Sequence, residues 1–139
     1  MHRNPDAAEI KRILQESRNV AVVGLSENPY RTSHAIASAL QRFGYRIFPV
    51  NPNLTGPVLG EEPYAAVEDI PERVDIVDVF RRSEKAMPVA EDAVAAGAKV
   101  LWMQSGVINY DAAEYAAEHG LAVVMDRCIK VDYGMLAGR

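Results

Sequence analysis

Short apolar runs alternate along this chain with longer segments in which apolar residues recur every three or four positions. The five runs cover residues 20–23, 45–50, 74–80, 99–103 and 121–125. They are too short for core helices and are typical of strands buried on both faces. The segments between them have helical periodicity, so the pattern predicts an α/β protein. We expect a single Rossmann-like, open parallel sheet of about five strands, with helices on both faces.

The first run leads into a turn of a kind that binds phosphate. Gly24 ends the run, a polar loop follows, and Thr32 stands where a helix N-cap is expected. Apolar residues then recur at helical spacing until Gly44 ends the helix. The first N–H groups of such a helix have no partners within it, and the helix dipole makes that end positive. A strand, a glycine turn and a helix N-terminus therefore predict a phosphate site.

The other segments are expected to complete the same domain, which would comprise residues 1–139. Residues 1–17 contain an amphipathic pattern, so we expect a helix that packs on one edge or face of the sheet. Ser83 and Asn109 are positioned to cap two further helices. Residues 128–136 are expected to form a short final helix.

Composition and charge narrow the functional classes. No apolar run reaches the roughly 18 residues of a membrane span, and the polar N-terminus lacks the apolar core of a secretion signal. We therefore expect a cytoplasmic protein with no membrane partner. The one cysteine excludes an internal disulfide, and three widely separated histidines do not predict a metal site. The net charge of −4 and the pI near 5.4 argue against nucleic acid as a partner. A protein partner or a homo-oligomer is compatible with the sequence.

The loops that follow the five runs carry the basic residues of interest, because ligands of open α/β sheets bind beyond the carboxyl ends of the strands. These loops contain six basic and four acidic residues, a net charge of +2. The rest of the chain contains nine basic and fifteen acidic residues, a net charge of −6. The sequence therefore predicts an electropositive binding face on an acidic protein, and hence an anionic ligand.

A nicotinamide dinucleotide fits the first loop poorly. The G-x-G-x-x-G pattern would need glycine at Ser26 and Pro29, and the acidic residue that holds the ribose is replaced by Asn51. The hydroxyls of Ser26, Thr32 and Ser33 still suit a diphosphate, and this interpretation is preferred to the alternative that they only cap the helix and fill a turn. An NAD(H)-binding sensor or regulator remains the alternative of a different class.

Four blocks of sequence resemble the small stand-alone CoA-binding proteins, which are related to the N-terminal domain of the succinyl-CoA synthetase α subunit. The blocks are VVGLSENPYRTSH, YRIFPVNPN, VDIVDVFRRSE and KVLWMQSGV, and they are followed by DRCIK. The resemblance covers nearly the whole chain. It implies a Rossmann-like fold whose strand-end loops bind coenzyme A or an acyl-CoA.

The resemblance also implies a role for individual positions. The pyrophosphate would be held by Gly24, Ser26, Arg31, Thr32 and Ser33. The adenosine side would be lined by Val50, Asn51 and Pro52. The pantetheine or phosphate arm would meet Phe80 and Arg81. Without the resemblance, Arg81 would be interpreted as a solvated surface charge. The floor would be closed by Gln104, Ser105 and Gly106.

Two departures from the related proteins argue against catalysis. The synthetase uses a phosphorylated histidine in a second domain that this sequence does not contain. Small relatives often have Glu-His after the DRC block, where this chain has Asp132 and Tyr133. We therefore expect binding without a reaction, with an enzyme that uses Cys128 on a CoA thioester as a further alternative. Asp75 and Asp78 lie three apart in a predicted strand and are not expected to form an acid–base pair.

Overall fold

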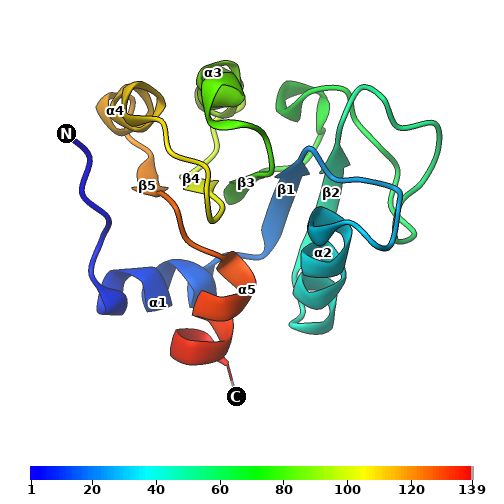
Figure 1. Cartoon of the computed structure of the whole chain (residues 1–139), viewed down its shortest axis with the longest axis horizontal. Coiled ribbons are helices and arrows are strands. Elements are labelled where there is room, and N and C mark those ends of the chain that lie inside the picture. The colour runs from blue at the N-terminus through cyan, green and yellow to red at the C-terminus, as the bar shows by residue number, and fades with distance from the viewer. Residues whose placement is uncertain (139) are drawn as a thin grey trace.

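In the computed structural model, which describes residues 1–138, five parallel strands form one open sheet (Figure 1). The strands are β1 Asn19–Val23, β2 Arg46–Val50, β3 Ile76–Val79, β4 Val100–Met103 and β5 Ala122–Val124. Their order across the sheet is β2-β1-β3-β4-β5, and each neighbouring pair is parallel. The chain therefore leaves β1 in one direction and returns on its other side at β3, which creates the opening between strand ends where ligands of such folds bind.

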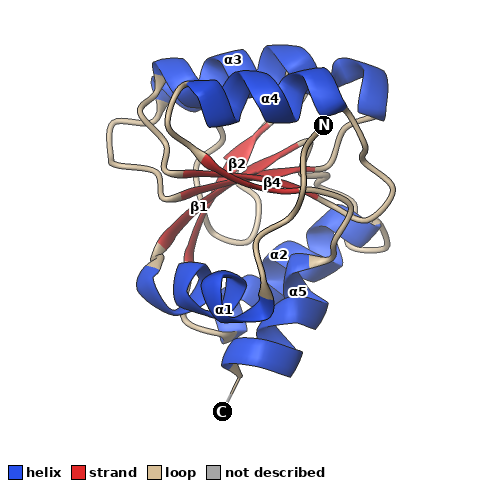
Figure 2. Ribbon diagram, turned by 90° about the vertical axis from the view of Figure 1, so that its left-hand side faces the viewer, coloured by secondary structure: helices blue, strands red, loops and turns tan. Residues whose placement is uncertain are grey.

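Helices cover both faces of this sheet (Figure 2). One face carries α3 and α4, and the opposite face carries α1, α2 and α5. Their bounds are α1 Ala7–Glu16, α2 Thr32–Arg42, α3 Ala86–Ala95, α4 Tyr110–Glu118 and α5 Ile129–Asp132. This architecture confirms the predicted Rossmann-like α/β fold. No helix within residues 1–138 is both long enough and apolar enough to cross a bilayer.

The alternation of side chains along β1 and β3 divides the core into two layers. Ala21 and Val77 face α3 and α4, whereas Val20 and Ile76 face α1, α2 and α5. Because both faces of each central strand are covered, the strands need no polar side, and this explains their nearly continuous apolar sequences. Asp78 interrupts this pattern in the middle of the sheet.

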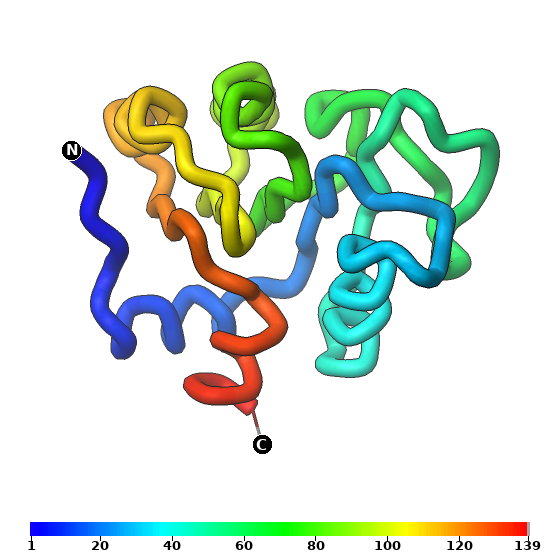
Figure 3. Tube along the Cα trace, viewed as in Figure 1, coloured from blue at the N-terminus to red at the C-terminus, as the bar shows by residue number. Residues whose placement is uncertain are grey.

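The predicted helix at the N-terminus is present and packs on the sheet as expected. It begins at Ala7, because Asp6 accepts a hydrogen bond from the backbone N–H of Glu9 at 2.9 Å. Ile10 and Leu14 are buried in the layer below the sheet. The C-terminal π-helical turn Tyr133–Ala137 packs on this helix (Figure 3).

Two predicted caps are wrong and one is confirmed. Asn109 caps α4 by accepting from the N–H of Ala112 at 2.9 Å. Thr32 is the first residue of α2 and not its cap; the cap position is Arg31, whose side chain makes no capping bond. Ser83 does not cap α3, because it lies in the 3₁₀ turn Ser83–Lys85 and its hydroxyl bonds to the loop after β4. The final helix is also shorter than expected and gives way to the π-helical turn.

Candidate functional site

The loops that follow β1, β3 and β4 enclose a cavity of about 610 Å³ at the carboxyl edge of the sheet. Ten of the thirteen residues predicted for the site line it. They are Gly24, Ser26, Arg31, Thr32, Ser33, Phe80, Arg81, Gln104, Ser105 and Gly106. The lining also contains three residues that were not predicted for the site, Tyr30, Arg82 and Val107. Arg82 had a signal in the sequence, because it is one of the cations counted in these loops.

Gly24 fixes the entry of the first loop into the cavity. Its backbone has φ of +89°, and a Cβ atom there would lie 2.2 Å from the carbonyl oxygen of Phe80. Its N–H donates to the carbonyl of Val50 at 2.8 Å. Only glycine permits both the left-handed conformation and this close approach of two strand ends. Glycine is therefore required at position 24 both by the turn and by the neighbouring strand end.

Side-chain oxygens brace the rest of this loop. The hydroxyl of Ser33 accepts from the N–H of Ser26 at 3.0 Å, and the hydroxyl of Ser26 accepts from the N–H of Asn28 at 3.0 Å. The Asn28 side chain in turn accepts from the N–H of Tyr30 at 2.9 Å. Each hydroxyl keeps its own proton for donation. The serines thus shape the loop, and any contact with a phosphate would come from those remaining protons.

The N-terminus of α2 presents backbone donors to the same cavity. The N–H groups of His34 and Ala35 both donate to the carbonyl of Arg31 at 3.1 Å. Within residues 1–138 the N–H groups of Thr32 and Ser33 have no recorded acceptor, as expected for the first turn of a helix. These two amides, together with the positive end of an 11-residue helix, favour the binding of an anion.

Three arginines make the cavity electropositive. Arg31, Arg81 and Arg82 line it, and in the described part of the chain none of them forms an ion pair. Among residues 1–138, no aspartate or glutamate lines the cavity. The predicted separation of charge is therefore present at this site: an acidic protein concentrates uncompensated cations at one mouth of its sheet.

The far wall of the cavity is held by hydrogen bonds between loops. The hydroxyl of Ser83 donates to the carbonyl of Gly106 at 3.2 Å and accepts from the N–H of Ile108 at 2.9 Å. The side chain of Asn109 donates to the carbonyl of Ser83 at 2.9 Å. The N–H of Gly106 donates to the carboxylate of Asp126 at 2.7 Å. The loops after β3, β4 and β5 are thereby joined into one rim.

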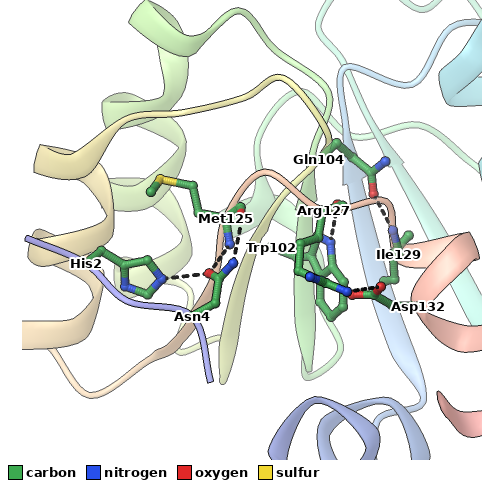
Figure 4. A network of polar contacts seen from close by, with 8 residues as sticks. All are labelled: His2, Asn4, Trp102, Gln104, Met125, Arg127, Ile129 and Asp132. Atoms are coloured by element: carbon green, nitrogen blue, oxygen red, sulfur yellow. Dashed lines mark hydrogen bonds and ion pairs between the residues drawn. The ribbon is translucent and has the colours of Figure 1, made fainter. Parts of the chain in front are cut away.

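The floor of the cavity is tied to the segment between β5 and α5 (Figure 4). Gln104, which is only 4% exposed, accepts from the N–H of Ile129 at 3.0 Å through Oε1. Two residues earlier, the indole of Trp102 donates to the carbonyl of Arg127 at 2.8 Å. Arg127 is itself held by a two-point ion pair with the buried carboxylate of Asp132, at 2.6 and 2.8 Å.

Three predicted residues lie away from the cavity. Val50 is buried in the core, and Pro52 is exposed in the loop after β2. Asn51 donates from its side chain to the carbonyl of Leu25 at 3.1 Å and so supports the first loop from behind. The structure therefore does not bring these three residues to the cavity with the other ten, and their contact with the adenosine part of a ligand stays a prediction.

Cys128, Asp75 and Asp78 are the other side chains considered as reactive groups, and they lie outside the cavity lining. Cys128 is half-buried at the cap position of α5 and does not line the cavity. Asp75 accepts from the backbone N–H groups of Arg18 and Asn19, both at 2.9 Å, which is a structural role. Asp78 is fully buried and has no hydrogen-bond partner among the described residues, and burial raises its pKa well above the usual value. Within residues 1–138, no group of three or more histidine, cysteine or acidic side chains is placed to hold a metal ion.

Comparison with known proteins places this geometry in a family. A family described as a CoA binding domain matches residues 18–134. YneT of Bacillus subtilis (strain 168), an uncharacterized protein, is 46% identical over 133 residues, which cover 96% of this chain and 98% of YneT. A hypothetical protein from Pyrococcus horikoshii OT3 is 34% identical, with a TM-score of 0.93 and 99% coverage of both chains. A Thermus thermophilus structure is also 34% identical, with a TM-score of 0.90, covering 95% of this chain and 99% of its own. The resemblance seen in the sequence is thus confirmed, and the chain belongs to the CoA binding domain family.

Proposed function

We propose that this protein binds coenzyme A or an acyl-CoA in the cytoplasm, gripping the diphosphate in the cavity at the carboxyl edge of the sheet, without catalysing a reaction on its own. Residues 1–139 would act as one CoA-binding domain. The observation that carries the proposal is a cavity lined by Arg31, Arg81 and Arg82. Within the described residues, none of these arginines forms an ion pair and no acidic side chain lines the cavity. Membership of the CoA binding domain family supports the choice of anion.

The strength of the interactions supports a ligand held by several loops at once. A micromolar ligand needs about −8 kcal/mol of binding free energy. A helix N-terminus offers only about 0.3–1 kcal/mol, and a hydrogen bond to a charged group about 1.5–3 kcal/mol. The amides of Thr32 and Ser33 and the three guanidinium groups together reach the required range. A cavity of about 610 Å³ also lies within the range of roughly 300–1,000 Å³ that small-molecule sites occupy.

The experiment is isothermal titration calorimetry of the pure protein with CoA, acetyl-CoA and NADH, together with native mass spectrometry to detect any ligand that copurifies. We expect saturable binding of CoA, weaker binding of NADH, and loss of most CoA affinity in Arg31→Ala. The matched control is Arg18→Ala, which removes the same charge from an exposed site at the amino edge of the sheet, where β1 begins. No heat change at millimolar CoA, or NADH binding more tightly than CoA, would reject the proposal.

A further inference from the structure

The side chain of Gln104 is almost fully buried, yet only one end of its amide has a partner in the protein. Its oxygen accepts from the N–H of Ile129 at 3.0 Å. Within the described residues no acceptor is recorded for its nitrogen, Nε2. The buried side-chain atoms that lack a partner are, in residues 1–138, the two carboxylate oxygens of Asp78 alone. Nε2 of Gln104 is therefore not sealed in the core.

The unpartnered nitrogen opens on the cavity. Gln104 is 4% exposed and is one of the residues that line the cavity, so its small exposed fraction faces the cavity from the floor. Figure 4 shows the amide with its oxygen turned to Ile129 and its nitrogen turned away from that contact. A buried donor that faces a ligand site is satisfied only when a ligand or a water molecule accepts from it.

The orientation of this amide is set by the protein and not by the ligand. A backbone N–H can only donate, so the group that faces Ile129 must be the amide oxygen. Turning the amide over would place an NH₂ group against that N–H and leave two buried donors unpaired, which costs more than a hydrogen bond returns. The cavity floor therefore presents a hydrogen-bond donor and no acceptor at this point.

We infer that Gln104 is a specificity-determining residue that selects a ligand with an acceptor oxygen above the floor, and that Ile129 fixes this polarity from the C-terminal segment. The inference rests on the proposed function, because it names which atoms of a CoA-like ligand the site accepts. The acceptor is an oxygen of the diphosphate or a carbonyl of the pantetheine arm. The two sources share the same chemistry and are separated by the choice of probe.

The test is Gln104→Glu, compared with wild type by calorimetry at pH 8 with CoA, ADP and pantetheine as separate probes. The introduced carboxylate keeps an oxygen for the N–H of Ile129 but replaces the donor at the cavity by a negatively charged acceptor. We expect CoA to bind about 10- to 100-fold more weakly, because a hydrogen bond to the ligand is lost and a negative charge faces the ligand's acceptor oxygen instead. A loss shared by ADP assigns the acceptor to the diphosphate, and a loss shared by pantetheine assigns it to the pantetheine arm.

Two controls separate this role from a structural one. Gln15→Glu makes the same change of charge at an exposed position of α1 and should leave the affinity unchanged. The affinity gap between Gln104→Glu and wild type should narrow as pH falls from 8 to 6, because a buried carboxyl beside an anion takes up a proton and can then donate. Folded Gln104→Glu protein that binds CoA as tightly as wild type at pH 8 would overturn the inference while the proposed function stands. Wild type that fails to bind CoA would remove both.

Discussion

Replacing Asp78 by leucine should make the protein more stable at neutral pH. The carboxyl group of Asp78 lies in β3, between Val22 of β1 and Trp102 of β4 in the strand register. Neither of its oxygens has a partner in the part of the chain that the structure describes. Leucine has the same branching pattern and leaves no polar atom to satisfy. A buried polar group without a partner costs about 1–3 kcal/mol, so Asp78→Leu should raise the free energy of unfolding by about that amount at low pH, where the carboxyl is protonated in both states, and by more at neutral pH.

The effect should depend on pH with a defined sign. Burial raises the pKa of Asp78 well above its usual value of 3.8, so the folded protein keeps the proton to higher pH than the unfolded chain does. The stability that this group contributes is therefore full below pH 3.8 and is lost as pH rises toward the folded pKa. Within that window the gap between Asp78→Leu and wild type should widen by about 1.4 kcal/mol per pH unit.

Urea unfolding between pH 5 and 8 measures this gap, with far-UV circular dichroism as the signal and the fluorescence of Trp102 as a second probe. Near neutral pH the expected increase in melting temperature is about 3–4 °C for each kcal/mol in a chain of this length. Asp78→Asn is the matched control, since it removes the titrating group but keeps two polar atoms. The gap in free energy of unfolding between Asp78→Leu and Asp78→Asn should therefore not change with pH, and Asp78→Asn should gain less stability over wild type than Asp78→Leu does. A less stable Asp78→Leu protein, or a gap that does not change with pH, would refute the reasoning.

Three further predictions concern the cavity. Gly24→Ala should abolish measurable CoA binding and lower the melting temperature by several degrees, because its Cβ would lie 2.2 Å from the carbonyl oxygen of Phe80; calorimetry and thermal unfolding check it, and normal binding would contradict it. Arg82→Ala should weaken CoA binding about 10-fold and reduce the salt dependence of the affinity between 50 and 300 mM, because one exposed cation is removed. Titrations in this salt range measure both effects, and an unchanged salt dependence would exclude a contact between Arg82 and CoA. Cys128→Ser should bind CoA as wild type does, because Cys128 does not line the cavity; a lost covalent CoA adduct in intact mass spectra would instead favour a reactive thiol.

The sequence was sufficient for those features of the site that depend on local pattern. The apolar run before Gly24, the polar loop and the helical spacing after it are all set within about 25 residues, and the structure contains a strand, turn and helix there. The electropositive face could also be predicted from the charges of the loops, because the loops that follow the strands of a parallel sheet lie on the same edge. Of the thirteen residues that the family resemblance implies for the site, ten line one cavity.

The features that the sequence did not give depend on contacts between distant segments. Ser83 has the residue type of a helix cap, but its hydroxyl is taken by Gly106 and Ile108, which are more than 20 positions away. The resemblance implies a ligand contact for Asn51, which stays a prediction, but it did not reveal that the Asn51 side chain supports Leu25 because β2 lies beside β1. In both cases a polar side chain satisfies a loop that becomes its neighbour only in the folded sheet, and no local pattern encodes that choice.

The hydrogen bonds of the first loop explain why a cavity rich in hydroxyls and amides favours an anion. Asn28 and the two serines use their acceptor oxygens on backbone N–H groups of the loop itself. The amide oxygen of Gln104 is likewise used by Ile129. With these acceptors engaged inside the protein, the residues that line the cavity offer the unpartnered amide of Gln104, the hydroxyl protons of the serines and three guanidinium groups. A ligand rich in donors would leave those groups unpaired, whereas phosphate and carbonyl oxygens satisfy them, so the discrimination arises from how the loop is braced as well as from its charge.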